Sequence, residues 1–452
     1  MGKALAILSG FDRRGAGVIN RAALMTTPLA SQTPPPSWWA LFHCFGMIGL
    51  LSFGGPAAQI ALMHRELVDR RDWLEEEAFL RGLSFCMLLP GPEAMQLATY
   101  TGWRMRGVGG GLLAGSLFII PGALVIAALV FLYVSFGTLP AVKSAFLGIK
   151  AAVVVIVIQA LWRISQKALK TAGAWALALG GFVALFVFDL PFPLVVLLAG
   201  GIGLLQRAPS TDPLPSAHHV PAHHGRTILF WTALWLLPLL GLSLIGAEFL
   251  ATIGWFFAKL AVVTFGGAYA VLAYMTQTVV SDHGWITTGQ MIDALGLAET
   301  TPGPLVLVTQ FVAMLAGSEM GGTKLAIAAG AVALWATFVP CFLWIFATAP
   351  YVERLTAHPR LRSALAAITA SVAGMMLNLS VWFLLHLLFQ TNTHRDLGPI
   401  SVPLPEFGSL DQTALILTAL APVVAALLRG RILWLLATMA CFGLVVAGFT
   451  VG

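Results

Sequence analysis

Apolar runs of spanning or half-spanning length follow one another along most of this 452-residue chain. A membrane-spanning helix needs about 20 predominantly apolar residues, and about a dozen runs reach or half reach that length. Only short polar stretches separate them. The pattern predicts an all-α polytopic membrane protein.

Several of these runs are interrupted at their centre. "LSFCMLLPGPEAMQLATY" (83–100) is about as long as a span, yet its middle holds "PGP" at 90–92, followed at once by Glu93. Proline breaks a helix interior, and an ionised Glu in hydrocarbon is costly. The run 39–63 is broken in the same way by "FGGP". These breaks demand a structural or functional reason.

The composition supports a membrane location. Of all residues, 58% are hydrophobic and 10% are charged, and the mean hydropathy is +0.88. A soluble domain carries about 25% charged residues, so this chain cannot cover its apolar side chains with polar surface. The net charge of +6 therefore reports topology and does not indicate a nucleic-acid partner. The cysteines lie singly in apolar runs, which predicts no disulfide, metal site or cofactor: Cys44, Cys86, Cys341 and Cys441.

The second half of the chain repeats the first. "SFGGPAAQIALM" begins at Ser52 and "TFGGAYAVLAYM" begins at Thr264, an offset of 264 − 52 = 212. Trp73 and Trp285 share this offset, as do the two PGP motifs. Further on the offset is 219, which pairs Pro121 with Pro340, Pro140 with Pro359 and Gln159 with Asn378. The chain is therefore a tandem duplication with a small insertion.

Five parts follow from this division. They are a disordered basic cytoplasmic tail (1–38), a first membrane repeat (39–206), a His-rich cytoplasmic linker (207–227), an extra transmembrane helix (228–247) and a second membrane repeat (248–452). The linker histidines resemble a metal cluster, but the surrounding Pro and Ser favour a solvated loop: His218, His219, His223 and His224.

Lys and Arg side chains indicate which loops are cytoplasmic. One path through the membrane places all the basic clusters at 163–170, 207–226, 354–362 and 429–431 on that side. The extra helix carries the chain across, so the second copy begins on the opposite side. We therefore predict two inverted-topology repeats, with a cytoplasmic N-terminus and a periplasmic C-terminus, as in many secondary transporters.

The loop 64–82 bears on how the broken runs cross the membrane. It holds four arginines, and it would lie outside if 39–63 crossed fully. If 39–63 and 83–103 instead enter, turn at FGGP and PGP, and return, the loop stays inside. The matching loop 281–290 contains no Lys or Arg, as an external loop should. Re-entrant hairpins are thus favoured, with fully crossing broken helices as the alternative.

The breaks predict a site for a small oxyanion at mid-depth in the membrane. Proline suits the first position of a helix, so each break would begin a short helix whose N–H groups find no partner in lipid. Glycine permits close approach of a ligand, and each helix N-terminus carries about +0.5 charge. The predicted substrate-binding residues here are Gly54, Gly55, Pro56, Pro90, Gly91, Pro92, Gly266, Gly267, Pro302, Gly303 and Pro304. Packing kinks filled by neighbouring helices are the alternative.

Other polar residues in apolar runs extend this candidate site. Lys150 lies near the middle of 141–161 as an anion ligand or counter-charge, and its repeat mate is the uncharged Thr369. Gln59 and Gln96 lie one turn into the short helices, where they would donate to an oxygen or simply satisfy polar packing.

Three more residues are candidates for coupling. Glu93 would carry a proton, pair with Lys150, or act only as a first-turn acid favoured by the helix dipole. Glu299 precedes the second PGP and has no acidic mate in the first copy. Lys259 lies two turns before Gly266 and would line the entrance.

These motifs resemble those of the chromate transporter family, long two-domain type. The resemblance rests on "SFGGPAAQIALMHRELV", "LLPGPEAMQLATYTGW", "GIKAAVVV", "VTFGGAYAVL" and "TPGPLV", and it spans roughly 39–450. It implies a bacterial inner-membrane protein that exports chromate, or a sulfate-like oxyanion, and confers chromate resistance. Two positions depart from the pattern. Ala268 stands where the first copy has Pro56, and Met47 is uncharged where the family often has Lys.

Two other classes of protein stay open. A passive anion channel would share the predicted site. A membrane-embedded enzyme would need a nucleophile, a metal or an acid–base set, and the sequence offers none outside the linker histidines, so no catalytic residue is predicted. The coupling ion, the choice between chromate and sulfate, and the oligomeric state, a homodimer included, are not fixed by the sequence.

Overall fold

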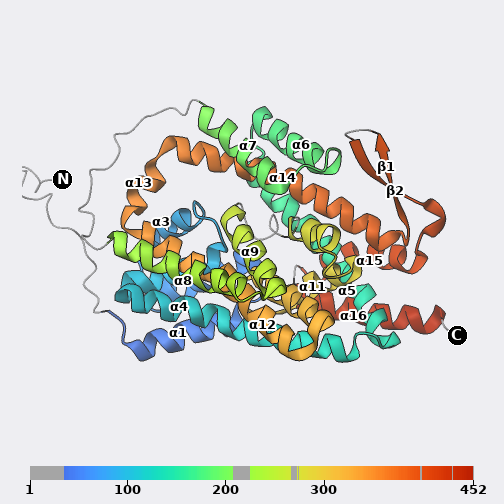
Figure 1. Cartoon of the computed structure of the whole chain (residues 1–452), viewed down its shortest axis with the longest axis horizontal. Helices are drawn as coiled ribbons and strands as arrows, with labels where there is room; N and C mark the ends of the chain where they lie inside the picture. The colour runs from blue at the N-terminus through green and yellow to red at the C-terminus, as the bar shows by residue number, and fades with distance from the viewer. Residues whose placement is uncertain are drawn as a thin grey trace, which may run out of the picture. The chain divides into compact units, whose positions relative to one another are not determined.

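The computed structural model describes residues 35–206, 224–265, 272, 274–397, 400–429 and 431–450 (Figure 1). The elements up to the linker are α1 (Trp38–Leu51), α2 (Gly55–His64), η2 (Arg65–Asp69), α3 (Glu76–Cys86), α4 (Glu93–Phe136), α5 (Pro140–Ala168), α6 (Ala172–Phe186) and α7 (Phe192–Leu205). After the linker come α8 (His224–Leu244), α9 (Glu248–Val263), η3 (Gln277–Asp282), α11 (Thr288–Thr300), η4 (Leu305–Leu307), α12 (Val308–Thr348), η5 (Ala349–Tyr351), α13 (Val352–Ala357), α14 (Pro359–Leu388), β1 (Asn392–Leu397), β2 (Ile400–Pro405), η6 (Phe407–Ser409), α15 (Gln412–Leu427) and α16 (Ile432–Thr450). The predicted all-α membrane architecture is confirmed.

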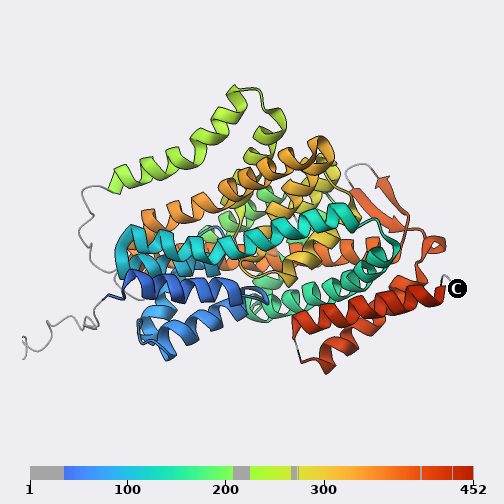
Figure 2. The same ribbon diagram turned by 90° about the horizontal axis from the view of Figure 1, so that it is seen from below.

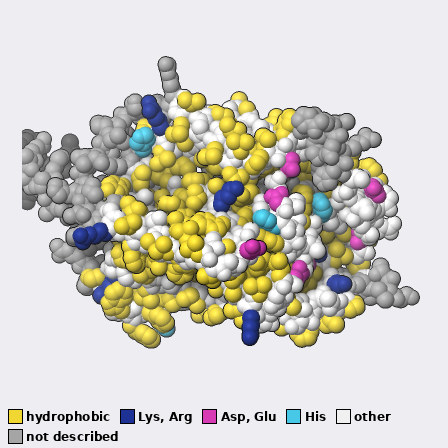
Figure 3. All heavy atoms as spheres, viewed as in Figure 1, with side chains coloured by type: hydrophobic (Ala, Val, Ile, Leu, Met, Phe, Trp, Pro, Cys, Tyr) yellow, Lys and Arg dark blue, Asp and Glu magenta, His cyan; other side chains and the backbone are white. Residues whose placement is uncertain are grey.

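The surface is apolar, as expected of a protein embedded in a lipid bilayer. Five of the described helices are long and apolar enough to cross a membrane: α4, α5, α8, the run of η4, α12 and η5, and α14. Apolar side chains cover most of the face seen in Figure 3. Leu197 on α7 is 71% exposed, which costs little in hydrocarbon and much in water.

The two longest helices each reverse direction partway. The backbone leaves the helical region at Arg106 and Gly107 within α4, and at Gly321 and Gly322 within α12. Gly102 packs directly against the carbonyl oxygen of Gly110, although eight residues of continuous helix would separate them by about 12 Å. The parts of α4 before and after Gly107 therefore lie against each other.

Backbone features recur at the offsets of the sequence repeat. The two π-helical segments η2 and η3 begin at 65 and 277, an offset of 277 − 65 = 212. At that same offset, Asp72 and Gly284 both have positive φ, at 50° and 58°. Gly91 and Gly303 do as well, at 121° and 87°. The duplication seen in the sequence is therefore present in the conformation of the chain.

Helices α5 and α14, one from each repeat, pack on the last two helices of the opposite repeat. By the repeat offsets, α5 corresponds to α14, and α6 and α7 correspond to α15 and α16, since 412 − 172 = 240 and 432 − 192 = 240. In space α5 packs against α15 and α16, whereas α14 packs against α6 and α7. Figure 2 shows α15 and α16, in red, beside α5. Small residues such as Gly148 and Gly374 let the helix backbones touch, as is typical in membranes.

Two polar loops add detail to the sequence-based expectation. The polar loop 390–411 contains an antiparallel hairpin of β1 and β2, in which Asn392 pairs with Pro405 and Leu397 with Ile400. This hairpin accounts for the rise of the repeat offset from 219 to 240. In the loop 64–82, whose acids already weaken the charge argument in the sequence, the buried carboxylate of Glu66 accepts from Arg70 at 2.8 Å.

A helix long and apolar enough to span a membrane, α8, lies where the sequence predicts an extra span, and it packs against α12 and α9. The Trp235 indole donates to the carbonyl of Ala336 at 3.0 Å, and the Trp335 indole donates to the carbonyl of Leu234 at 3.2 Å. Several predictions lie outside the described residues: the disordered tail before residue 35, the linker histidines 218, 219 and 223, and the glycines Gly266 and Gly267.

Candidate functional site

The predicted helix starts in the first repeat are confirmed. Helix α2 begins at Gly55 after Gly54, whose φ of +89° few residues other than glycine adopt, and Pro56 lies in its first turn. Helix α4 begins at Glu93, after Gly91 with φ +121°. Pro92 is the residue just before the helix and not its first, as its ψ of 110° shows.

The second repeat begins its helix later. Pro304 precedes the short 3-10 turn η4, and α12 starts only at Val308. Residues 302–304 are fully buried. The second PGP thus ends an apolar helix and leads into a tight turn, without the exposed helix start that the sequence predicts.

The broken segments of the two repeats are joined by a reciprocal pair of hydrogen bonds. The Gly91 amide donates to the carbonyl of Thr264 at 2.9 Å, and the Gly303 amide donates to the carbonyl of Ser52 at 3.0 Å. Both donors and both acceptors are related by the 212-residue offset. In this conformation the two PGP amides are therefore used between repeats, and an anion would have to displace these bonds to reach them.

The PGP turns also rest on the long helices of the opposite repeat. A side chain at Gly91 would lie 3.0 Å from the sulfur of Cys341 on α12. Gly303 lies against the carbonyl of Phe118 on α4, and Gly122 packs on the carbonyl of Pro302. Cys341 and Gly122 match at the 219 offset, so this contact too is made twice.

The two predicted glutamines hold the turns in place. The Gln59 side-chain amide donates to the carbonyl of Gly303 at 2.7 Å and to that of Ser52 at 3.3 Å. The Gln96 amide donates to the carbonyl of Pro90 at 2.6 Å. Both side chains are buried, with 2% and 0% exposure. Their donors serve the protein backbone in this conformation.

The first FGGP turn is the accessible one among the turns that the structure describes. Gly54, Gly55 and Pro56 are half-buried, and the next two residues, Ala57 and Ala58, are exposed. A side chain at Gly54 would meet only Ala58 and Ile432. The N-terminus of α2 is therefore not covered by other described parts of the protein.

Lys150 is placed away from these turns and has a different partner from the one expected. Its ammonium lies 3.3 Å from the carboxylate of Asp293 on α11, not beside Glu93. It also lies next to Gly289, in the first turn of α11, whereas the second PGP follows the last turn. The Tyr133 hydroxyl donates to the other oxygen of Asp293 at 2.8 Å.

The other coupling candidates lie in three separate segments of the chain. Glu93 is half-buried at the start of α4, and Glu299 is 5% exposed near the end of α11. Lys259 is exposed on α9, with its ammonium 5.8 Å from the centre of the Tyr274 ring. These three residues therefore come from three different helices, α4, α11 and α9.

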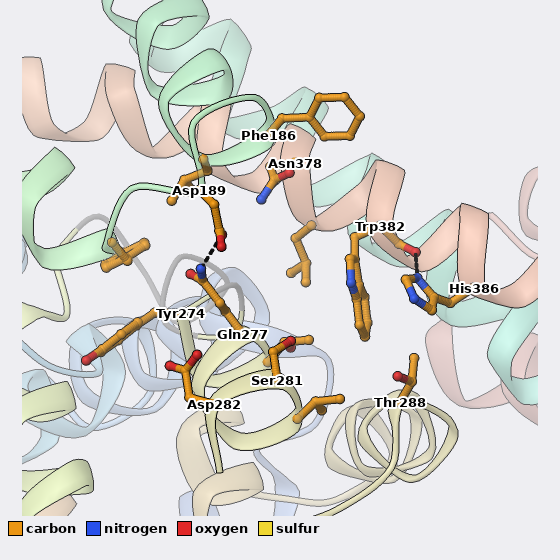
Figure 4. Close-up of a pocket in the computed structure, with 15 residues that line it drawn as sticks. Phe186, Asp189, Tyr274, Gln277, Ser281, Asp282, Thr288, Asn378, Trp382 and His386 are labelled. Carbon is orange, nitrogen blue, oxygen red and sulfur yellow. Dashed lines mark hydrogen bonds between the residues drawn. The ribbon is translucent and has the colours of Figure 1, made fainter. Parts of the chain in front are cut away.

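A cavity of about 270 Å³, lined by both polar and apolar side chains, lies where η3, α14 and the turn after α6 meet (Figure 4). The Asp189 carboxylate accepts from the Gln277 amide at 2.5 Å, and His386 contacts the carbonyl of Trp382 at 2.9 Å. Asp282 and Asn378 also line it. None of the predicted site residues does. Sequence reasoning singled out only Asn378, as the repeat mate of Gln159.

Ionisable groups outside the spans cluster on the loop after α2. His64 contacts Glu76 and Asp69, and the hydrogen bond to Glu76 raises the pKa of His64 above its ordinary value. Across the described part of the chain, no three His, Cys, Asp or Glu residues are grouped so as to hold a metal ion.

A polytopic helical membrane protein with two interlocked copies of one unit and broken helices between them has the construction of a membrane transporter. The chain belongs to the chromate transporter family, whose model, described as "Chromate transporter", matches residues 39–204 and 251–445. The two matched regions confirm the long two-domain type. An oxyanion is the substrate class of this family, whose members are transporters and not enzymes.

Individual relatives agree. The chain is 32% identical to the "Chromate transport protein" of Pseudomonas aeruginosa, over 79% of this chain and 83% of that protein. It is 29% identical to the "Probable chromate transport protein" of Synechococcus elongatus, over 75% and 83% respectively. The "Uncharacterized transporter YwrA" of Bacillus subtilis is 32% identical over only 29% of this chain, which is 75% of its own length. No solved structure matches the chain.

Proposed function

We propose that this protein is a secondary active transporter that exports chromate, or a related tetrahedral oxyanion such as sulfate, across the bacterial inner membrane. The two repeats have inverted topology, with the N-terminus in the cytoplasm and the C-terminus in the periplasm. The anion binds at the broken segments, and it first meets the N-terminus of α2 at Gly54–Pro56.

The accessible start of α2 carries this proposal. A helix N-terminus presents unpaired backbone N–H groups and about +0.5 charge, which suit an anion. Gly54 has no side chain to obstruct the approach, and the neighbouring alanines are small and exposed. Names of relatives that include chromate support the choice of a tetrahedral oxyanion.

The reciprocal bonds between repeats support a transporter over a channel. The Gly91 and Gly303 amides donate to carbonyls of the opposite repeat, so the broken segments of the two repeats are joined to each other in this conformation. A pore would need a continuous path past them. Alternating access requires only that one set of contacts opens at a time, which is the usual role of repeat interfaces.

Counterflow tests the proposal directly. Purified protein in liposomes loaded with unlabelled chromate or sulfate should accumulate the labelled anion transiently. A passive channel would give no such overshoot once the membrane potential is clamped, and its current would reverse at a potential fixed by the anion alone.

A matched pair of variants localises the site. Gly54→Ala forces a side chain into a left-handed conformation, which costs roughly 1–2 kcal/mol and should reduce counterflow by about tenfold. Gly46→Ala, on α1 with no neighbour within contact distance, should leave counterflow near wild type. Equal activity of the two variants would exclude Gly54 from the site.

A further inference from the structure

An ion pair joins the two repeats inside the helical bundle. Asp293 on α11 is 6% exposed; one carboxylate oxygen lies 3.3 Å from the Lys150 ammonium, and the other accepts from the Tyr133 hydroxyl at 2.8 Å. Lys150 and Tyr133 belong to the first repeat and Asp293 to the second. The other ion pairs of the described residues all lie between 64 and 81.

This cluster has no counterpart at the pseudo-equivalent position. The repeat mate of Asp293 is Arg81, which pairs with Glu77 on its own helix at 3.2 Å. The mate of Lys150 is Thr369, whose hydroxyl donates to the carbonyl of Leu365. Duplication alone therefore does not account for the three residues. The cluster of these three residues occurs at only one of the two pseudo-equivalent positions.

The helices around the cluster pack differently in the two repeats. Helix α11 packs closely on α5, where Gly296 lies against Ile149. Its mate α3 packs instead on α4 and α13. The Lys150–Asp293 contact thus joins α5 and α11, which pack on each other. Their repeat mates, α14 and α3, do not pack on each other in this way. The Lys150–Asp293 pair is the kind of contact that must open and re-form when the repeats exchange arrangements.

Opening this contact has a clear electrostatic consequence. A carboxylate that loses its buried partner must be hydrated or neutralised, because an unpaired charge in a low-dielectric interior is strongly unfavourable. The Lys150 side chain is 20% exposed, so water reaches its end of the pair more easily than the Asp293 end, at 8%. A proton on Asp293 removes the negative charge and leaves the Tyr133 hydroxyl a neutral partner.

Few other charges face Asp293. From the packed elements, α5 offers Lys150 and α4 offers Tyr133. Glu319 of α12 binds Gln290, and His386 of α14 lines the cavity beside Thr288. Helix α16 contributes only Cys441 among its described side chains, and η4 has no ionisable residue.

We propose that Asp293 is the proton-binding residue of the transport cycle, resting on the oxyanion transport proposed above. When α5 and α11 separate, the carboxylate takes up one proton and becomes a carboxylic acid, while Lys150 keeps its ammonium charge. The pair changes from a net charge of zero to +1, which offsets one negative charge of a passing oxyanion. When the helices close, the ion pair re-forms and the proton leaves.

The test separates anion exchange from proton coupling. Wild type, Asp293→Asn and the control Asp282→Asn are compared in liposomes, Asp282 being an exposed acid on η3. Asp293→Asn should keep counterflow at equal pH within about threefold of wild type, which is under 1 kcal/mol. It should lose accumulation driven by a pH gradient. Asp282→Asn should keep both activities.

Three results would overturn this assignment. In the first, Asp293→Asn accumulates the anion in response to a pH gradient as well as wild type does. In the second, Asp293→Asn stays folded but loses counterflow. In the third, wild type shows counterflow but no accumulation driven by a pH gradient. If wild type shows no counterflow at all, the proposed transport function itself fails. That outcome is therefore distinguishable from failure of the proton site.

A second variant keeps the test decisive if Asp293→Asn does not fold. Asp293→Glu retains the carboxyl group but shifts its position relative to Lys150 and Tyr133. It should keep gradient-driven accumulation with a displaced pH profile. A pH profile identical to that of wild type would show that the protonated group lies elsewhere.

Discussion

Individual glycines set how closely the two repeats approach. Gly122 on α4 packs on the carbonyl of Pro302, and the φ of Gly303 is in the left-handed region at the same contact. An added methyl group at Gly122 would overlap the backbone oxygen of Pro302, which cannot move aside as a side chain can, and it would also overlap the side chain of Leu307. The contact has no room to adjust, so its cost must appear as strain or as displacement of the second PGP turn.

Substitution of this glycine should therefore destabilise the folded protein. Gly122→Ala is expected to lower the free energy of unfolding by about 1–3 kcal/mol through overpacking. Gly180→Ala on α6, where no atom lies within contact distance, should instead raise it by up to about 1 kcal/mol through helix propensity. Thermal unfolding in detergent measures both. A melting temperature for Gly122→Ala at or above that of wild type would contradict the tight contact.

Some residue-scale features could be predicted and others could not. Gly54, Pro56 and Gly91 were recognisable because glycine and proline encode backbone conformation locally. The partner of Lys150 was not, because charge pairing depends on which helices meet. Asp293 lies in "MIDALGLA", an acid in an apolar run, and such a position is a candidate for function. Comparison of the repeats hid it, since its mate is Arg81.

At the scale of elements, the break positions of the sequence predict the helix starts of the first repeat, at Gly55 and Glu93, but not that of the second, where α12 begins only at Val308. They do not predict what the ends contact. The amides of Gly91 and Gly303 bind Thr264 and Ser52, and that pairing depends on the arrangement of the two repeats, which neither segment encodes alone. The β1–β2 hairpin was missed because its first strand is polar and the hairpin has no equivalent in the first repeat, although Gly398-Pro399 between the strands is a turn signal.

The hairpin should be dispensable for transport. Replacing 391–409 with a three-residue linker, like the one between α5 and α6, removes β1 and β2 without touching α14 or α15. The variant should fold and show counterflow within about twofold of wild type, a difference under 0.5 kcal/mol. Loss of counterflow with unchanged expression and melting temperature would instead give the hairpin a direct part in transport.

The whole molecule is organised by exchange between its repeats. Helices α5 and α14 each pack on the last two helices of the opposite half. Each PGP turn is hydrogen-bonded to the broken segment of the opposite half. Such reciprocity is what a two-fold relation between the repeats would produce. Whether that axis lies in the membrane plane, as inversion requires, is a question of topology.

Labelling of two equivalent exposed positions answers it. Asp69 and Ser281 share the 212 offset and are both exposed. Because Cys44, Cys86 and Cys341 are buried, only Cys441 needs replacement to give a quiet background. Asp69→Cys should react with an impermeant maleimide only in inside-out vesicles, and Ser281→Cys only in intact cells stripped of the outer membrane.

The pattern of labelling separates two claims. Reaction of both positions from the same side would rule out inverted repeats. Reaction from opposite sides, with position 69 outside, would preserve inversion but place the loop 64–82 outside and exclude the re-entrant form of 39–63.

The crossed packing of α5 and α14 also dictates an order of assembly during synthesis. When the ribosome has completed α5, more than 200 residues must still be synthesised before its partners α15 and α16 are present. Until then, the face of α5 that carries small residues contacts lipid. The first half cannot finish folding until the second half emerges. A half-length chain with this unit would face the same unmet surface, and a second copy of the unit would be the natural source of the missing helices.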